Sequence, residues 1–216
     1  STTGLRDGFM YSLLSEEMRE QDALLEASAE IALLRSRSPE HCQELSNWTE
    51  TAFKVLGLKT NIAIERYRMA ACNLADIAWR SSMDYRAEQT LGFINNAGFN
   101  ALSHEGRAYL AIVNFHRYQG LGSKKVPPKI AKLAGDDVSK NARVLAALFR
   151  VLYLFSASSA GILPQLKLAR TERDNLLFVI PKHMEFLAGE RPRSRINQLS
   201  REIGEDIEIE IVEEEV

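Results

Sequence analysis

Residues 161–170 read Gly161-Ile162-Leu163-Pro164-Gln165-Leu166-Lys167-Leu168-Ala169-Arg170, and at this stretch the spacing of apolar residues changes. Before it, apolar residues recur with the period of an amphipathic helix. After Pro164, apolar and polar residues alternate, which is the period of a half-buried strand. The sequence therefore predicts a helical region that ends near residues 160–164, followed by a smaller region that contains strands.

Working back from Gly161, several segments have the apolar spacing of helices. The best-defined start is at Ser38, a good N-cap, followed by Pro39 at the first helical position. The segment Val144–Phe155 has so few polar residues that we expect it to lie at the centre of the fold. The expected helices cover residues 22–35, 39–56, 62–79, 85–95 and 106–119, and a last one opens at Asp137 or Ser139 and ends at Phe155.

Working forward from Pro164, three segments alternate in the manner of strands. They are residues 165–170, 175–180 and 206–211, and Thr171–Asp174 links the first two as a hairpin. A helix is expected over Arg193–Ile203. The predicted fold class is therefore mainly α, with a helical bundle over residues 21–162 and a small α+β domain of about three strands over residues 163–216.

The composition is that of an ordinary soluble protein, with 45% apolar and 26% charged residues. The formal net charge of −2 gives no reason to expect a nucleic-acid partner. No apolar run reaches the roughly 18 residues of a membrane span, so we expect no membrane partner. Cys42 and Cys72 fall at buried helical positions and belong to no metal-binding pattern, which indicates reduced thiols and a cytoplasmic location.

The stretch Asn73-Leu74-Ala75-Asp76-Ile77-Ala78 bears on function. A His-Asp pair at Ala75-Asp76, combined with His41 and His116, would make a metal cluster plausible. Alanine has no lone pair to give to a metal, so we expect neither a metal nor a catalytic residue here. His41 and His116 are then expected to be partly buried, hydrogen-bonded imidazoles.

Short motifs in a fixed order carry a resemblance to a known family. The chain resembles the C-terminal region of the exopolyphosphatase / guanosine-pentaphosphate phosphohydrolase family over nearly its whole length. The motifs that carry the resemblance are Gly4-Leu5-Arg6-Asp7-Gly8, Glu40-His41, Leu74-Ala75-Asp76-Ile77-Ala78, Asn114-Phe115-His116-Arg117 and Arg143-Val144-Leu145-Ala146-Ala147-Leu148-Phe149-Arg150.

The resemblance implies that this helical bundle is a degenerate HD-like domain. Ala75 stands where the metal motif has His, Glu88 where relatives often show another His, and Tyr153 about where the last metal-binding Asp would fall. Residues 1–20 are then the junction helix from an upstream actin-like domain. The same resemblance places catalysis and its Mg²⁺ in upstream domains, with no cofactor in this segment.

If the parent protein is an exopolyphosphatase, this segment is expected to bind polyphosphate and to form a homodimer. A polyanion with about one charge per phosphate needs a track of cations, as a nucleic-acid backbone does. The alternatives are a nucleotide-sensing or guanosine-pentaphosphate phosphohydrolase module, a pure dimerisation module, or lysines that are simply solvated. The candidate polyphosphate-binding residues are Arg86, His116, Arg117, Lys124 and Lys125, with Arg80 beside Arg86 and with Arg191, Arg193 and Arg195 as a separate basic run.

Overall fold

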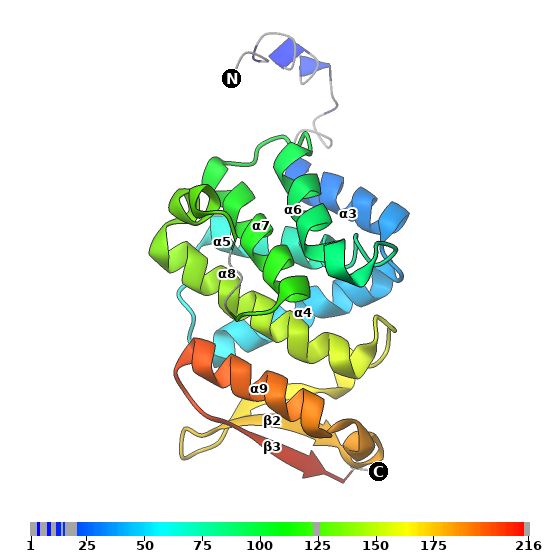
Figure 1. Cartoon of the computed structure of the whole chain (residues 1–216), viewed down its shortest axis with the longest axis vertical. Coiled ribbons are helices and arrows are strands. Elements are labelled where there is room, and N and C mark those ends of the chain that lie inside the picture. The colour runs from blue at the N-terminus through cyan, green and yellow to red at the C-terminus, as the bar shows by residue number, and fades with distance from the viewer. Residues whose placement is uncertain are drawn as a thin grey trace.

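A computed structural model of the chain describes residues 21–122 and 126–213, together with residues 4, 8, 9, 12, 13 and 15. A bundle of helices stands on a small sheet at one end of the molecule (Figure 1). The mainly α fold with a three-stranded sheet is as predicted. In chain order the elements are α3 (Ala23–Arg35), α4 (Pro39–Val55), α5 (Ile62–Asn73), η1 (Met83–Tyr85), α6 (Arg86–Asn96), α7 (His104–Gln119), α8 (Pro128–Ser156), η2 (Leu163–Gln165), β1 (Lys167–Arg170), β2 (Leu176–Pro181), η3 (Lys182–Leu187), α9 (Glu190–Ile203) and β3 (Ile207–Val212).

Side-chain caps define where several helices begin. The Ser38 hydroxyl accepts a hydrogen bond from the backbone N–H of His41 at 3.1 Å, so the predicted start of α4 is confirmed. Asp22 caps α3 and Asn61 caps α5 in the same way. These caps satisfy N–H groups that would otherwise lack partners in the first helical turn.

Helix α8 is the centre of the bundle, as its apolar sequence predicted. The side chains of Leu145, Leu148 and Leu152 are fully buried. The helix begins earlier than expected, at Pro128, and is interrupted at Gly135, whose φ of 72° lies outside the helical region. A positive φ suits glycine because it has no Cβ, so the segment before Gly135 and the long helix after it join at a kink.

The predicted helix over residues 62–79 is too long, since α5 ends at Asn73 and a series of turns covers residues 74–80. Leaving the helix here frees backbone carbonyls that side chains then bind. Tyr118 donates its hydroxyl to the carbonyl of Ala75, and Arg86 donates to the carbonyl of Trp79. The turns also direct Asp76 into the interior, where it is 2% exposed.

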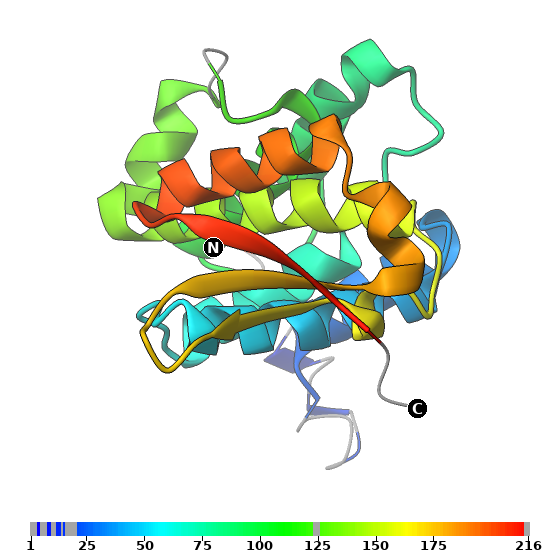
Figure 2. The ribbon, with the colours of Figure 1, turned by 90° about the horizontal axis from the view of Figure 1, so that it is seen from below.

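The sheet has the order β1-β2-β3, with β1 antiparallel and β3 parallel to β2. Parallel neighbours need a crossover, and η3 with α9 supply it. Seen from below, α4 lies behind β1, while α9 runs beside β3 with α8 behind α9 (Figure 2). Phe178 of β2 contacts the rings of Trp48 and Phe155 on the inner face of the sheet, at centroid distances of 6.0 and 5.4 Å.

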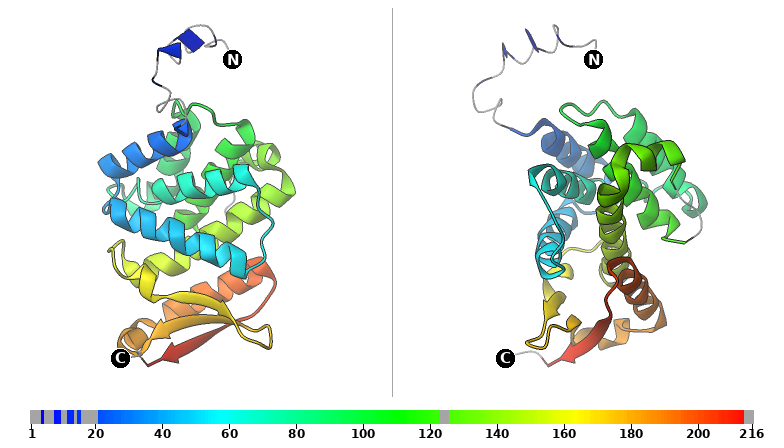
Figure 3. Two further views of the ribbon diagram at one scale, coloured as in Figure 1. Left: turned by 180° about the vertical axis from the view of Figure 1, so that it is seen from behind. Right: turned by 90° about the vertical axis from the view of Figure 1, so that its left-hand side faces the viewer.

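One buried apolar cluster runs from the bundle into the sheet. It includes Leu45 and Leu148 on the helical side and Phe178, Ile180 and Leu199 beyond the predicted boundary. Views from behind and from the side place the sheet directly against α4 and α8 (Figure 3). Among the described residues, no helix is long and apolar enough to cross a membrane.

Candidate functional site

Asp76 lies in the interior of the bundle and is held by two arginines from different helical segments. The guanidinium of Arg37, which follows α3, donates from Nε to Oδ2 at 2.7 Å and from Nη2 to Oδ1 at 2.8 Å. Arg117 of α7 donates from Nη2 to Oδ1 at 3.0 Å. Burial by itself would raise the pKa of Asp76, but the two guanidinium groups outweigh it and lower the pKa. Asp76 is therefore a carboxylate with two cations as counter-charges.

Arg117 is almost fully buried and lies between aromatic rings. Its guanidinium carbon is 3.7 Å from the ring centroid of Tyr153 and 4.2 Å from that of Tyr118. Burial acts to lower the pKa of Arg117, and the surrounding Tyr153, Tyr118 and Asp76 raise it, with a net rise. Ring faces attract a desolvated cation, so these contacts stabilise the charge of Arg117 inside the protein.

His41 lies beside this group and is 1% exposed. Its Nε2 is 2.8 Å from the hydroxyl oxygen of Ser156, and its ring meets Tyr153 edge-on at 4.9 Å. Burial lowers the pKa of His41 to about 4, because a charged imidazole is unfavourable there. The expected hydrogen-bonded imidazole is therefore present.

The residues around Asp76 do not fit a metal ion. Both Asp76 oxygens are already hydrogen-bonded to guanidinium groups, and Ala75 contributes only a carbonyl, which Tyr118 binds. Within the described residues, no group of three or more His, Cys, Asp or Glu side chains could hold a metal. Arg37 and Arg117 instead bring their positive charge to Asp76.

The remaining sequence-predicted binding residues are found in three settings. His116 is buried, and its Nδ1 is 2.7 Å from the carbonyl oxygen of Gly120. Arg86 is half-buried and donates to the carbonyls of Ser81 and Trp79. Lys124 and Lys125 lie outside the described residues. Of the named candidates, Arg86, His116 and Arg117 thus direct polar groups toward the protein itself.

An exposed arginine cluster lies next to this interior site and is defined by Arg35, Arg37 and Arg80 around Trp79. The guanidinium carbons of Arg80 and Arg37 are 5.0 and 5.8 Å from the centroid of the Trp79 ring. Arg35 joins through its backbone, since the indole Nε1 of Trp79 donates to the carbonyl of Arg35 at 2.9 Å. The guanidinium carbon of Arg35 itself is 4.8 Å from the centroid of the Phe93 ring. Sequence reasoning named Arg80 but missed Arg35 and Arg37. The signal available in the sequence was that these two arginines flank Ser36, at the end of α3.

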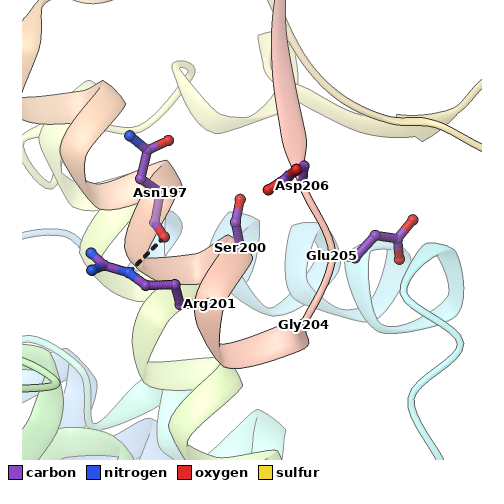
Figure 4. Close-up of a pocket in the computed structure, with 6 residues that line it drawn as sticks. All are labelled: Asn197, Ser200, Arg201, Gly204, Glu205 and Asp206. Carbon is purple, nitrogen blue, oxygen red and sulfur yellow. Dashed lines mark hydrogen bonds between the residues drawn. The ribbon is translucent and has the colours of Figure 1, made fainter.

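A hollow of about 540 Å³ lies where α9 turns into β3 (Figure 4). Its polar groups mainly serve the fold. The hydroxyl of Ser200 accepts from the backbone N–H of Ile207, Arg201 donates to the carbonyl of Asn197, and Glu205 pairs with Arg170. We assign no chemistry to this hollow.

Comparison with known proteins agrees with the layout. A family model described as "Exopolyphosphatase, C-terminal" matches residues 24–210. This range extends from the start of α3 into β3 and so includes the Asp76 site, the arginine cluster and most of the sheet. A search among curated proteins finds no match.

Proposed function

The chain belongs to the exopolyphosphatase C-terminal family, and on this premise we propose that it binds polyphosphate without cleaving it. In this proposal the parent protein is a phosphoanhydride hydrolase that releases orthophosphate from chain ends. Its catalytic residues lie outside this segment. The segment itself holds the part of the polyphosphate chain that is distant from the reacting end.

The arginine cluster around Trp79 is the observation that carries the proposal. Arg35 and Arg80 are exposed, and the side chain of Arg37 is 39% exposed. Arg37 uses Nε and Nη2 for Asp76, and within the described residues its Nη1 makes no hydrogen bond. Planar guanidinium groups match the geometry of phosphate oxygens, and several of them side by side suit a polyanion.

The interior site supports binding rather than cleavage. Asp76 could act as a base or a metal ligand only if its oxygens were free, and Arg37 and Arg117 occupy them. A depressed carboxylate pKa also makes Asp76 a weak proton acceptor near neutral pH. Asp76 therefore serves to fix Arg37 at the surface beside Trp79.

The cluster favours phosphate over a nucleobase as ligand. A base would be expected to stack on the half-buried Trp79 ring, but Arg37 and Arg80 already lie over that ring. Phosphate oxygens need only the outward-facing N–H groups, so they displace no contact. This argues for polyphosphate over the nucleotide-sensing alternative.

The test compares the chain with the variant Arg35→Ala/Arg80→Ala, using fluorescently labelled long-chain polyphosphate and titrations at several salt concentrations. We expect affinity to fall about tenfold, with a salt dependence that is less steep by about one unit of log K per log salt for each arginine removed. Lys59→Ala/Arg173→Ala, which removes two exposed cations from the loops after α4 and β1, is the matched control. If both variants lost the same affinity for polyphosphate, only net charge would matter, and a site at Trp79 would be contradicted.

A further inference from the structure

A groove of about 430 Å³ runs between α4 and β1, on the side of the molecule opposite the crossover helix α9. Apolar groups form most of its walls, and its volume is in the range typical of ligand sites. The α4 wall presents one helical face at spacings of three and four residues. The lining side chains used below are Trp48, Thr51 and Ala52 from α4, and Pro164, Leu166 and Leu168 from the β1 side.

The edge of β1 that faces this groove has unpaired backbone groups. Thr171 donates its N–H to the carbonyl of Asn175, which makes this a hydrogen-bonded pair of the hairpin. Such pairs alternate along antiparallel strands, so the N–H and C=O of Leu168 point away from β2. The carbonyl of Leu166 points the same way and accepts from the Trp48 indole at 2.7 Å. Since β1 has no neighbour except β2 in the described sheet, Leu168 offers a free donor and acceptor.

Glu44 lies in the groove wall, and one of its two carboxylate oxygens has no hydrogen bond among the described residues. Its Oε1 accepts a hydrogen bond from the N–H of Gly161 at 2.6 Å. Its Oε2 is buried and has no hydrogen-bond partner among the described residues. A buried acceptor without a donor is unfavourable, so a ligand that brings a donor or a positive charge to this oxygen gains affinity.

We propose that this groove binds an extended peptide segment of a partner protein, which adds to the sheet as a fourth strand beside β1. Main-chain hydrogen bonds to Leu168 align the peptide, as in other cases of strand addition. Alternate apolar side chains of the peptide enter the groove against Trp48, Ala52 and Leu168. A basic side chain of the peptide donates to Oε2 of Glu44.

A second copy of this chain matches the groove less well. Its other sheet edge, β3, carries Glu208 and Glu210, and carboxylates would be brought toward Glu44. Its own β1 carries Arg170, whose guanidinium is already bonded to Glu205 at 2.7 and 2.8 Å. Its β1 also carries Lys167, which lines this groove in each copy, so pairing β1 with β1 would bring two lysines into one groove. A partner peptide with a basic residue only at the Glu44 end avoids this repulsion and is the better occupant.

The direct test uses a fluorescein-labelled peptide of alternating Val and Thr with one Arg near its end, titrated into the full chain and followed by anisotropy. We expect saturable binding and slower amide hydrogen exchange at Leu168. A peptide with N-methyl groups on the residues that pair with β1 should not bind, because it lacks the donors. Equal binding of the N-methylated peptide would overturn strand addition.

Variants of the groove test its side-chain contacts. Thr51→Trp fills the groove from an exposed position and should abolish binding, while Lys54→Trp, on the same helix but outside the groove, should not. Glu44→Gln should weaken the Arg peptide about tenfold and leave a Gln-containing peptide unchanged. If peptides fail to bind and Thr51→Trp instead converts a dimer to a monomer in light scattering, a second copy is the occupant and the proposal is wrong. Polyphosphate plays no part in these measurements, so this proposal and the previous one fail independently.

Discussion

Arg37 binds both carboxylate oxygens of Asp76, although the two residues are separated by 39 positions in the chain. The pair joins the end of α3 to the turns that follow α5, and Arg117 of α7 completes it from inside. Asp76 and Arg117 are buried, whereas the side chain of Arg37 reaches solvent. Ion pairing thus links the interior of the bundle to the exposed arginine cluster.

Replacing Asp76 with Asn should destabilise the fold strongly. The substitution keeps the shape of the side chain but leaves the buried guanidinium of Arg117 without a counter-charge. Removing one partner of a buried pair costs about 3–5 kcal/mol. Urea unfolding at pH 7 measures the change. Glu50→Gln, which breaks an exposed pair with Lys54, is the control and should cost less than about 1 kcal/mol.

The same pair gives an acid-dependent contribution to stability. Since the folded pKa of Asp76 lies below the ordinary value of 3.8, its contribution is fully present above that pH and is lost as the pH falls through the folded value. Relative to the native chain, Asp76→Asn should therefore show a shallower loss of unfolding free energy below about pH 4. An identical acid slope in both proteins would contradict this.

His41 should make the fold less stable as the solution is acidified from about pH 6.5 to about pH 4. Its folded pKa of about 4 lies below the ordinary 6.5, so the unfolded chain binds a proton that the folded chain does not. The loss is at most about 3 kcal/mol. Arg117 and Arg37 oppose protonation of His41, and Asp76 favours it.

Urea unfolding across this pH range measures the slope, and His41→Gln should make it less steep. Part of the slope should remain, because burial also lowers the pKa of His116. His104→Gln, which replaces an exposed imidazole, is the matched control. An unchanged slope in His41→Gln would mean that His41 is protonated equally in both states.

Gly106→Ala should destabilise the first turn of α7. A Cβ at this position would overlap the ring of Tyr67 and the side chain of Leu102. Tyr67 cannot easily move, because its hydroxyl is hydrogen-bonded to Ser103 at 2.9 Å. Overpacking of this kind typically costs about 1–3 kcal/mol. Thermal unfolding measures it, and Gly92→Ala, where the added Cβ meets nothing within 4 Å, is the control.

Lys124→Ala/Lys125→Ala tests the remaining part of the sequence-predicted track in the full-length enzyme. On the proposed function, we expect weaker binding of long polyphosphate and nearly unchanged hydrolysis of very short chains, because short chains would need only the catalytic residues proposed to lie outside this segment. Each exposed phosphate contact is worth on the order of 1 kcal/mol, so the change in affinity is modest. Equal losses for long and short chains would contradict a role of these lysines in binding the distant part of the chain.

Local sequence predicted the helices and strands because their periodicity is a property of neighbouring residues. The change of period at Pro164, the cap at Ser38 and the apolar run of α8 all have structural counterparts at those positions. The prediction of a helix over residues 62–79 was wrong at its C-terminal end. Its last residues turn away for contacts with Arg37 and Arg117, which no local pattern encodes.

By itself, then, the sequence determined the mainly α class, the small sheet and the absence of a complete His-Asp metal motif, since each depends on residue types at short spacing. Tertiary structure decided which cations reach the surface. Arg117 and His116 are basic in the sequence but buried in the fold, while Arg35 and Arg37 come to Trp79 only when α3 packs against the turns after α5. The groove beside β1 likewise exists only because residues 44–52 of α4 lie against a strand more than a hundred positions later. Burial and charge pairing act between residues that are close in space, and spacing along the chain does not specify that closeness.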